Sequence, residues 1–320
     1  MATVTRISAR GGFFAPLLVI TLAVAFGGLN PPAARAASHT YGWPVKPFHV
    51  QHPVRGFFGD PRIGGNPFGS ARQFHFGVDV SAPDGTAVFA TASGVVSFVP
   101  RHPDAVVITI RSGVQFSYWH LVPSVRSGQL VRAYVTRIGR IARGRGHVHF
   151  SERRGGRYVN PLRPGAMGPF VDGTRPWVRL VTAERNSRAV RVDALRGTVD
   201  LIAEAYDETP LRVAEPWHDK PVMPALVRWR LVRPNGSTTT WRKVLDFRWT
   251  IPAPSAFSSV YALSTDQNRP NRPGRYRILL ARGWNSATIR DGRYLLEVTV
   301  SDTRGNRSRF RTELQLANRQ

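Results

Sequence analysis

Four of the nine histidines of this 320-residue chain lie in short patterns that suit metal chemistry. The patterns are His75-Phe-Gly-Val-Asp79, Tyr118-Trp-His120-Leu121 and His147-Val-His149. The chain has no cysteine, so a transition-metal site has to be built from imidazole and carboxylate groups. That ligand set is typical of catalytic zinc, and a structural zinc site made of thiolates is excluded.

The His147-Val-His149 pattern opens an alternating segment, residues 147–151, that predicts the start of a β-strand. Side chains two residues apart share one face of a strand, so His147 and His149 should point into one cavity while Val148 points the other way. The spacing allows two metal ligands, or one ligand and one catalytic base. The residues alone leave open which of the two histidines is the ligand.

His75 and Asp79 lie where a glycine-rich loop enters an apolar run that begins at Val78, with Gly77 between them. A loop-to-strand junction can bend so that both side chains reach one ion, which a regular strand would not easily allow. All three patterns fall within about 75 residues. We therefore interpret them as one zinc site with catalytic bases.

The stretch from Trp43 to Pro164 resembles the catalytic domain of the lysostaphin-type and LytM-type zinc metallopeptidases, the M23 peptidase family. Six blocks over about 120 residues carry this resemblance, and they stand in the family's order. They are Phe58–Arg62, His75–Val88, Ala92–Val96, Tyr118–Leu121, His147–Phe150 and Asn160–Leu162. The segment 138–146 departs from the family pattern, being short and basic, and leaves the shape of the groove and the preferred bond open.

The resemblance implies that His75, Asp79 and His149 ligate one Zn²⁺ per chain, with water in the fourth position. His120 and His147 would be the catalytic histidines outside the metal's coordination shell. One would accept a proton from the water and the other would hydrogen-bond the developing oxyanion, and which does which stays open. Since all five positions are intact, the enzyme is favoured over the family's members that have lost ligands and activate other wall hydrolases.

Residues 1–36 read as a secretory signal peptide. Arg6 and Arg10 precede an apolar run from Phe13 to Leu29, and Ala34-Arg-Ala36 fits a cleavage site after Ala36. The alternative is an uncleaved anchor, but a bilayer span needs about 20 apolar residues and this run is shorter. We expect a secreted, wall-associated protein with no membrane span after cleavage.

The charge of the chain points to anionic partners. A net charge of +25 comes from 45 basic and 20 acidic residues. Outside the membrane such a field favours peptidoglycan and anionic wall polymers. Nucleic acid is disfavoured because the arginines are spread over both halves without a basic aromatic module. We expect a monomer.

The strand and turn signals predict an all-β protein of two domains. We expect a peptidase domain at 37–165, an antiparallel sheet whose groove holds the zinc, then a linker at 166–176 and an immunoglobulin-like or fibronectin-like β-sandwich at 177–320. In the first domain, strands are expected at 88–99, 106–111 and 114–120, with turns at Pro103-Asp104 and Ser112-Gly113. In the second, they are expected at 198–206, 226–232, 276–280, 294–300 and 310–316.

Five tryptophans of the second half allow two interpretations. They are Trp217, Trp229, Trp241, Trp249 and Trp284. A sugar-stacking surface is one interpretation, and we favour the other, that most of them pack in the core or between sheets. Trp217-His218-Asp219 is expected to be a surface loop and not a second metal site.

The proposed activity is hydrolysis of cross-link or stem peptides in bacterial peptidoglycan by zinc-activated water. The alternative is a non-catalytic wall-binding protein, or an activator of another wall hydrolase, that uses the same groove and docks through the β-sandwich.

Overall fold

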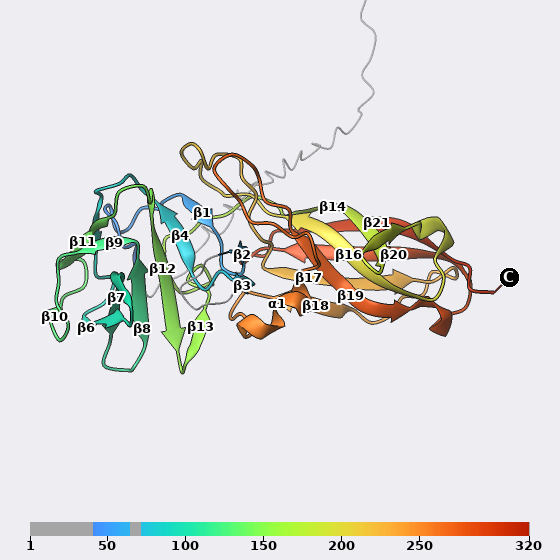
Figure 1. The fold of residues 1–320 in the computed structure, drawn as a ribbon, viewed down its shortest axis with the longest axis horizontal. Helices are drawn as coiled ribbons and strands as arrows, with labels where there is room; N and C mark the ends of the chain where they lie inside the picture. The colour runs from blue at the N-terminus through green and yellow to red at the C-terminus, as the bar shows by residue number, and fades with distance from the viewer. Residues whose placement is uncertain (1–40, 65–71, 320) are drawn as a thin grey trace, which may run out of the picture. The chain divides into compact units, whose positions relative to one another are not determined.

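The computed structural model describes residues 41–64 and 72–319, which belong to one compact unit (Figure 1). The expected signal peptide, 1–36, lies outside the described residues. Nearly all regular structure is antiparallel β, as predicted. None of the helices among the described residues combines the length and the apolar character that a bilayer span requires.

The N-terminal half, residues 41–164, is built on an eight-stranded antiparallel sheet. Its order is β1-β4-β12-β8-β7-β6-β10, with β13 paired to β12. These strands are β1 (Val54–Gly56), β4 (Val78–Ser81), β6 (Gly94–Val99), β7 (His102–Thr109), β8 (Gln115–Trp119), β10 (Leu130–Val131), β12 (His147–Arg154) and β13 (Arg157–Val159). Two smaller sheets flank it, β5-β11-β9 and β2-β3. Their strands are β2 (Pro61–Ile63), β3 (Arg72–Phe74), β5 (Ala87–Phe89), β9 (Leu121–Pro123) and β11 (Arg137–Ile141).

Alternation along β12 and β4 separates a packed face from a polar one. Val148 and Phe150 are fully buried, and so are Val78 and Val80 on the neighbouring strand. The intervening residues, which carry the histidines and Asp79, must therefore point to the opposite face. The predicted strand at the His-Val-His pattern and its division into two faces are confirmed.

Two predictions in this half were wrong. Residues 88–99 do not form one strand, because the chain turns between β5 and β6, where Thr91 holds the hydroxyl of Tyr118 through its backbone N–H at 2.9 Å. The Pro103-Asp104 turn is also absent, since both residues lie in a bulge of β7. The chain reverses before β7, at Arg101, which has the positive φ of 65° that a tight turn requires. The turn at Ser112-Gly113 is confirmed, with Gly113 at φ 80°.

The C-terminal half, residues 177–319, holds two four-stranded antiparallel sheets, β15-β14-β16-β19 and β18-β17-β20-β21. Their strands are β14 (Trp177–Arg185), β15 (Arg188–Val190), β16 (Thr198–Tyr206), β17 (Leu226–Val232), β18 (Arg242–Asp246), β19 (Arg277–Asn285), β20 (Gly292–Ser301) and β21 (Arg307–Leu316). Short helical turns occur at η1 (Val192–Ala194), η2 (Pro254–Ala256), α1 (Phe257–Val260) and η3 (Ser286–Thr288). The sheets pack face to face, since the indole N–H of Trp229 on β17 donates to the carbonyl of Leu280 on β19 at 2.8 Å.

All five strands expected in this half are present, and β16 and β17 have the predicted bounds. The strands β14, β15 and β18 were missed, because their sequences alternate poorly between apolar and polar residues. An immunoglobulin-like or fibronectin-like topology and the domain boundaries stay predictions. The expectation that most of the five tryptophans are core was wrong: Trp229 and Trp284 are buried, whereas Trp249 is 54% exposed and Trp217 and Trp241 are half-buried.

A turn at residues 57–60 of the N-terminal half packs against the C-terminal half. Gly59, at φ 91°, faces Phe247 of the C-terminal half so closely that a β-carbon would overlap its ring. The hydroxyl of Tyr261 donates to the Gly59 carbonyl, and the backbone N–H of Met223 donates to Asp60 Oδ1 at 2.8 Å. The C-terminal half therefore helps to hold this turn in place.

We expect Gly59→Ala to destabilise the protein more than Gly113→Ala does. Both glycines have φ between 80° and 91°, so both variants carry a left-handed backbone cost of about 1–2 kcal/mol. Only Gly59 is crowded, whereas a β-carbon at Gly113 meets no atom within 4 Å among the described residues. Overpacking should add about 1–3 kcal/mol, measured as the difference in the free energy of unfolding in urea. Equal losses in the two variants would contradict this packing.

Candidate functional site

His75 is positioned by the turn at residues 57–60. Its backbone N–H donates to the Asp60 carbonyl at 2.8 Å, and its own carbonyl accepts from Gly59 at 2.9 Å. The ring nitrogen Nδ1 lies 2.8 Å from the carbonyl oxygen of Phe57. A carbonyl only accepts, so Nδ1 carries the proton and Nε2 presents a lone pair on the other side of the ring.

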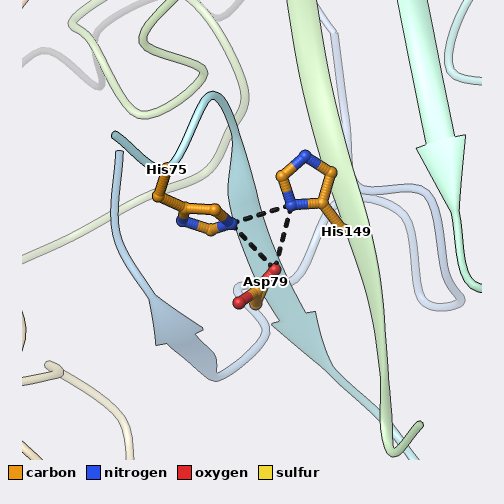
Figure 2. Close-up of side chains that lie close together, drawn as sticks. All are labelled: His75, Asp79 and His149. Atoms are coloured by element: carbon orange, nitrogen blue, oxygen red, sulfur yellow. Dashed lines mark hydrogen bonds and ion pairs between the residues drawn. The ribbon is translucent and has the colours of Figure 1, made fainter. Parts of the chain in front are cut away.

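The pairing of β12 with β4 places His149 directly opposite Asp79. His75 Nε2 lies 3.0 Å from Asp79 Oδ1 and 2.8 Å from His149 Nδ1, and His149 Nδ1 lies 3.1 Å from Asp79 Oδ1 (Figure 2). All three side chains are buried. The three atoms offered lie within 4.8 Å of one another, so this group could hold a metal ion.

The chemistry of this donor set fits a cation. Burial lowers the pKa of His75 to about 3, so the imidazole is neutral. Burial acts to raise the pKa of Asp79, but the neighbouring imidazoles and Arg62 hold it well below its usual range, so the carboxylate is charged. Two neutral imidazoles and one carboxylate that converge on one point match a three-ligand zinc site with an open fourth position.

Arg62 binds the carboxylate of Asp79 and is itself paired with Asp60. Arg62 Nη2 lies 2.8 Å from Asp79 Oδ2, while Arg62 Nη1 lies 3.6 Å from Asp60 Oδ2. Asp60 is buried, which raises its pKa to about 6. With Oδ2 bound to Arg62, Oδ1 is left to face the imidazoles. No role for Arg62 or Asp60 was predicted, although both fall within the Phe58–Arg62 block.

His147 lies on the same face of β12, and its Nε2 is 3.4 Å from Asp79 Oδ1. Its Nδ1 lies 2.7 Å from the carbonyl oxygen of Arg145 and 2.7 Å from Nη2 of Arg55. The ring of His120, directly after β8, is 4.7 Å from that of His147 between centroids. Its Nδ1 is 3.8 Å from Asp104 Oδ2. Burial, and then the neighbouring imidazoles, lower the pKa of His120.

One cavity of about 260 Å³ collects all five predicted residues. His75, Asp79, His120, His147 and His149 line it, together with Trp119 and Phe76. Sequence reasoning missed Arg55, and it missed Trp217, Gln267 and Asn268 of the C-terminal half, which line the cavity as well. No spacing could have revealed the last three, because they approach the site only through the packing of the two halves.

The part of the chain that carries this site is similar to known peptidases. Residues 73–161 match Peptidase family M23, and the matched range contains all five predicted site residues. The DD-carboxypeptidase/endopeptidase Mpg of Neisseria meningitidis and that of Neisseria gonorrhoeae are each 35% identical over 100 residues. That region is 28% of this chain and 22% of each relative, so the similarity spans about a fifth of the relatives' length.

Two solved peptidase structures are also similar to part of the chain. A zinc-containing peptidase from Vibrio cholerae is 29% identical, covering 37% of this chain and 37% of its own, with a TM-score of 0.30. The catalytic domain of the M23 protein EnpA from Enterococcus faecalis is 26% identical, covering 37% and 96%, with a TM-score of 0.27. These TM-scores are low, so the strand pairing and the sequence match define the site.

We expect Arg62→Gln to weaken zinc binding without unfolding the protein. Loss of a hydrogen-bonded partner behind a ligating carboxylate typically costs about 10–100-fold in metal affinity. Affinity would be measured by competition with a chromogenic chelator, with Arg111→Gln, an exposed arginine of the same half, as the matched control. Unchanged affinity in Arg62→Gln would show that Asp79 needs no support from Arg62.

Proposed function

We propose that this chain, whose residues 73–161 match Peptidase family M23, is a secreted zinc-dependent endopeptidase that hydrolyses peptide bonds in bacterial peptidoglycan. The observation that carries the proposal is the convergence of His75, Asp79 and His149 beside two further histidines in one cavity. Export by cleavage after Ala36 and a monomeric state belong to the same proposal.

Three atoms would hold the zinc: His75 Nε2, Asp79 Oδ1 and His149 Nδ1. A zinc ion held by these residues would polarise the scissile carbonyl and would lower the pKa of a bound water from about 15.7 to roughly 7. The hydrogen bond from His75 Nδ1 to the Phe57 carbonyl fixes the tautomer that leaves Nε2 free to ligate. The hydrogen bond from Arg62 occupies Oδ2 of Asp79 and leaves Oδ1 free to ligate.

We assign the base to His147 and the oxyanion contact to His120. When His147 Nδ1–H donates to the carbonyl of Arg145, Nε2 presents its lone pair to the cavity and can accept a proton. Arg55 only donates, so the tautomer with the proton on Nδ1 leaves the nearby Nη2 of Arg55 without a hydrogen bond to His147 and available to another acceptor. His120, on the other side of His147, is placed to hydrogen-bond the oxygen that gains charge.

The C-terminal half offers a basic face for an anionic wall polymer. On the outer face of one sheet, Arg228 pairs with Thr299, which pairs in turn with Arg309, and Arg307 lies two residues further along β21 on the same face. The ring of Trp241 lies 5.0 Å from the Arg228 guanidinium. Arginine binds phosphate with bidentate hydrogen bonds, so a phosphodiester polymer suits this face. The alternative function, a non-catalytic wall-binding protein or activator, would use the same face.

We expect wild-type protein to bind one zinc per chain and to cleave purified peptidoglycan. His149→Ala should lose both zinc and cleavage. His147→Ala should keep zinc and lose about 10²–10⁴-fold in rate, the usual contribution of a general base. Metal analysis and mass spectrometry of released fragments measure the two properties, and His49→Ala, an exposed histidine outside the cavity, is the control.

If the wild-type protein binds one zinc per chain but cleaves peptidoglycan of no cross-link type, the proposal that it is an enzyme is contradicted. The non-catalytic alternative would then predict that His149→Ala leaves wall binding, and any effect on a partner hydrolase, unchanged.

We expect the basic face to dominate binding to a purified phosphodiester wall polymer. The triple variant Arg228→Gln, Arg307→Gln, Arg309→Gln should reduce the slope of log affinity against log salt by about 2–3, close to one per lost contact. A control triple variant removes the same charge from exposed arginines of the N-terminal half, Arg111→Gln, Arg126→Gln and Arg140→Gln. Equal effects in both variants would mean that binding depends on overall charge alone.

A further inference from the structure

One wall of the catalytic cavity comes from the C-terminal half. Trp217, Gln267 and Asn268 line the same cavity as the five site residues. Trp217 lies in the loop between β16 and β17, and the other two precede β19. Residues outside the range matched by the M23 family, 73–161, therefore line the cavity beside the histidines.

The loop that carries Trp217 is anchored on both sides. Asp207 and Val222 close it with two backbone hydrogen bonds of 2.7 and 2.9 Å. The carbonyl of Pro221 accepts from Asn268 Nδ2 at 2.6 Å and from the hydroxyl of Tyr276 at 2.9 Å. Fixed ends of this kind limit the positions that Trp217 can take.

The loop is also tied to the turn that positions His75. The next residue along the chain, Met223, donates from its backbone N–H to Asp60 Oδ1 at 2.8 Å. The side-chain oxygen of Gln267 accepts from the backbone N–H of Ile63. The indole is thus presented to the cavity by a fixed segment.

Trp217 contacts a cation that reaches the site. The guanidinium carbon of Arg55 lies 4.2 Å from the indole centroid, within the range of a cation–π interaction. Arg55 Nη2 lies 2.7 Å from His147 Nδ1. Burial lowers the pKa of Arg55 to about 10, so the group remains charged at neutral pH.

Arg55 has spare capacity for an anion. A guanidinium has five N–H donors, and at most one of its nitrogens is occupied by the contact with His147. Across residues 41–64 and 72–319, no carboxylate lies within ion-pair distance of Arg55, whereas Arg62 pairs with Asp79 and Asp60. Asp79 and Asp84 act on Arg55 only from beyond ion-pair distance, so this partly buried cation on the wall of the cavity suits a carboxylate supplied by the ligand.

We propose that Arg55 and Trp217 form a subsite that recognises a free carboxylate of the substrate peptide next to the scissile bond. The inference rests on the proposed function for the nature of the substrate. Arg55 binds the carboxylate, and Trp217 is a positioning residue that holds the guanidinium by its face and contributes an apolar surface to the peptide. The C-terminal half thereby contributes to the substrate specificity of the site.

The test compares two synthetic stem-peptide substrates that differ only in a carboxylate or a carboxamide beside the scissile bond. Wild type should prefer the carboxylate, and Trp217→Ala should lose that preference through a KM for the carboxylate substrate about 10-fold higher, with zinc content unchanged. Trp217→Phe, which keeps an aromatic face, should restore most of it. Trp249→Ala removes an exposed tryptophan of the same half and should behave as wild type.

Two outcomes would overturn the inference: equal KM for both substrates in wild type, or an unchanged preference in Trp217→Ala. Failure of the proposed function is separate, because wild type would then cleave neither substrate. Calorimetric binding of the same two peptides to the zinc-loaded wild type and Trp217→Ala proteins decides the subsite in that case. Tighter binding of the carboxylate peptide by wild type alone would support it, and equal affinities would reject it.

Discussion

The pairing of β12 with β4 is the constraint on which the site depends. It sets His149 opposite Asp79 and puts Val148 and Val80 together on the packed face. A slip of one residue would bring the histidines into the core and the valines into the cavity, which would cost both apolar burial and the solvation of polar groups. The same alternation that stabilises the sheet therefore fixes two of the three candidate ligands.

The third, His75, depends on a different kind of support. It lies between β3 and β4, where its backbone hydrogen bonds to Asp60 and Gly59, and the contact of its ring with the Phe57 carbonyl, tie it to the turn at residues 57–60. That turn is held on its far side by Phe247, Tyr261 and Met223. Ligand geometry in the N-terminal half thus depends on packing against the C-terminal half, which acts as a structural support for the site as well as lining its cavity.

Local pattern was sufficient for part of this structure. The alternation at His147 predicted both the strand and its faces, and the strands β16 and β17 were found with their bounds because apolar runs there end at turn residues. The ordered motifs named all five residues that meet in the cavity. What they could not supply was contact between segments far apart in sequence. Trp217 contacts Arg55, which is 162 positions away in the sequence, and Gly59 is crowded by a ring 188 positions away. Neither contact produces a local sequence pattern.

The excess of arginine has more than one physical role. Glu297, fully buried on β20, is surrounded by Arg230, Arg309 and Arg311, and Glu152 on β12 is held by Arg163 at 2.7 Å. A buried carboxylate is costly unless it is paired and hydrogen-bonded, and the planar guanidinium does both. One glutamate among three arginines still leaves a surplus of positive charge at the surface. Arg309 belongs both to this group and to the basic face of the sheet, so net charge alone does not separate the two roles.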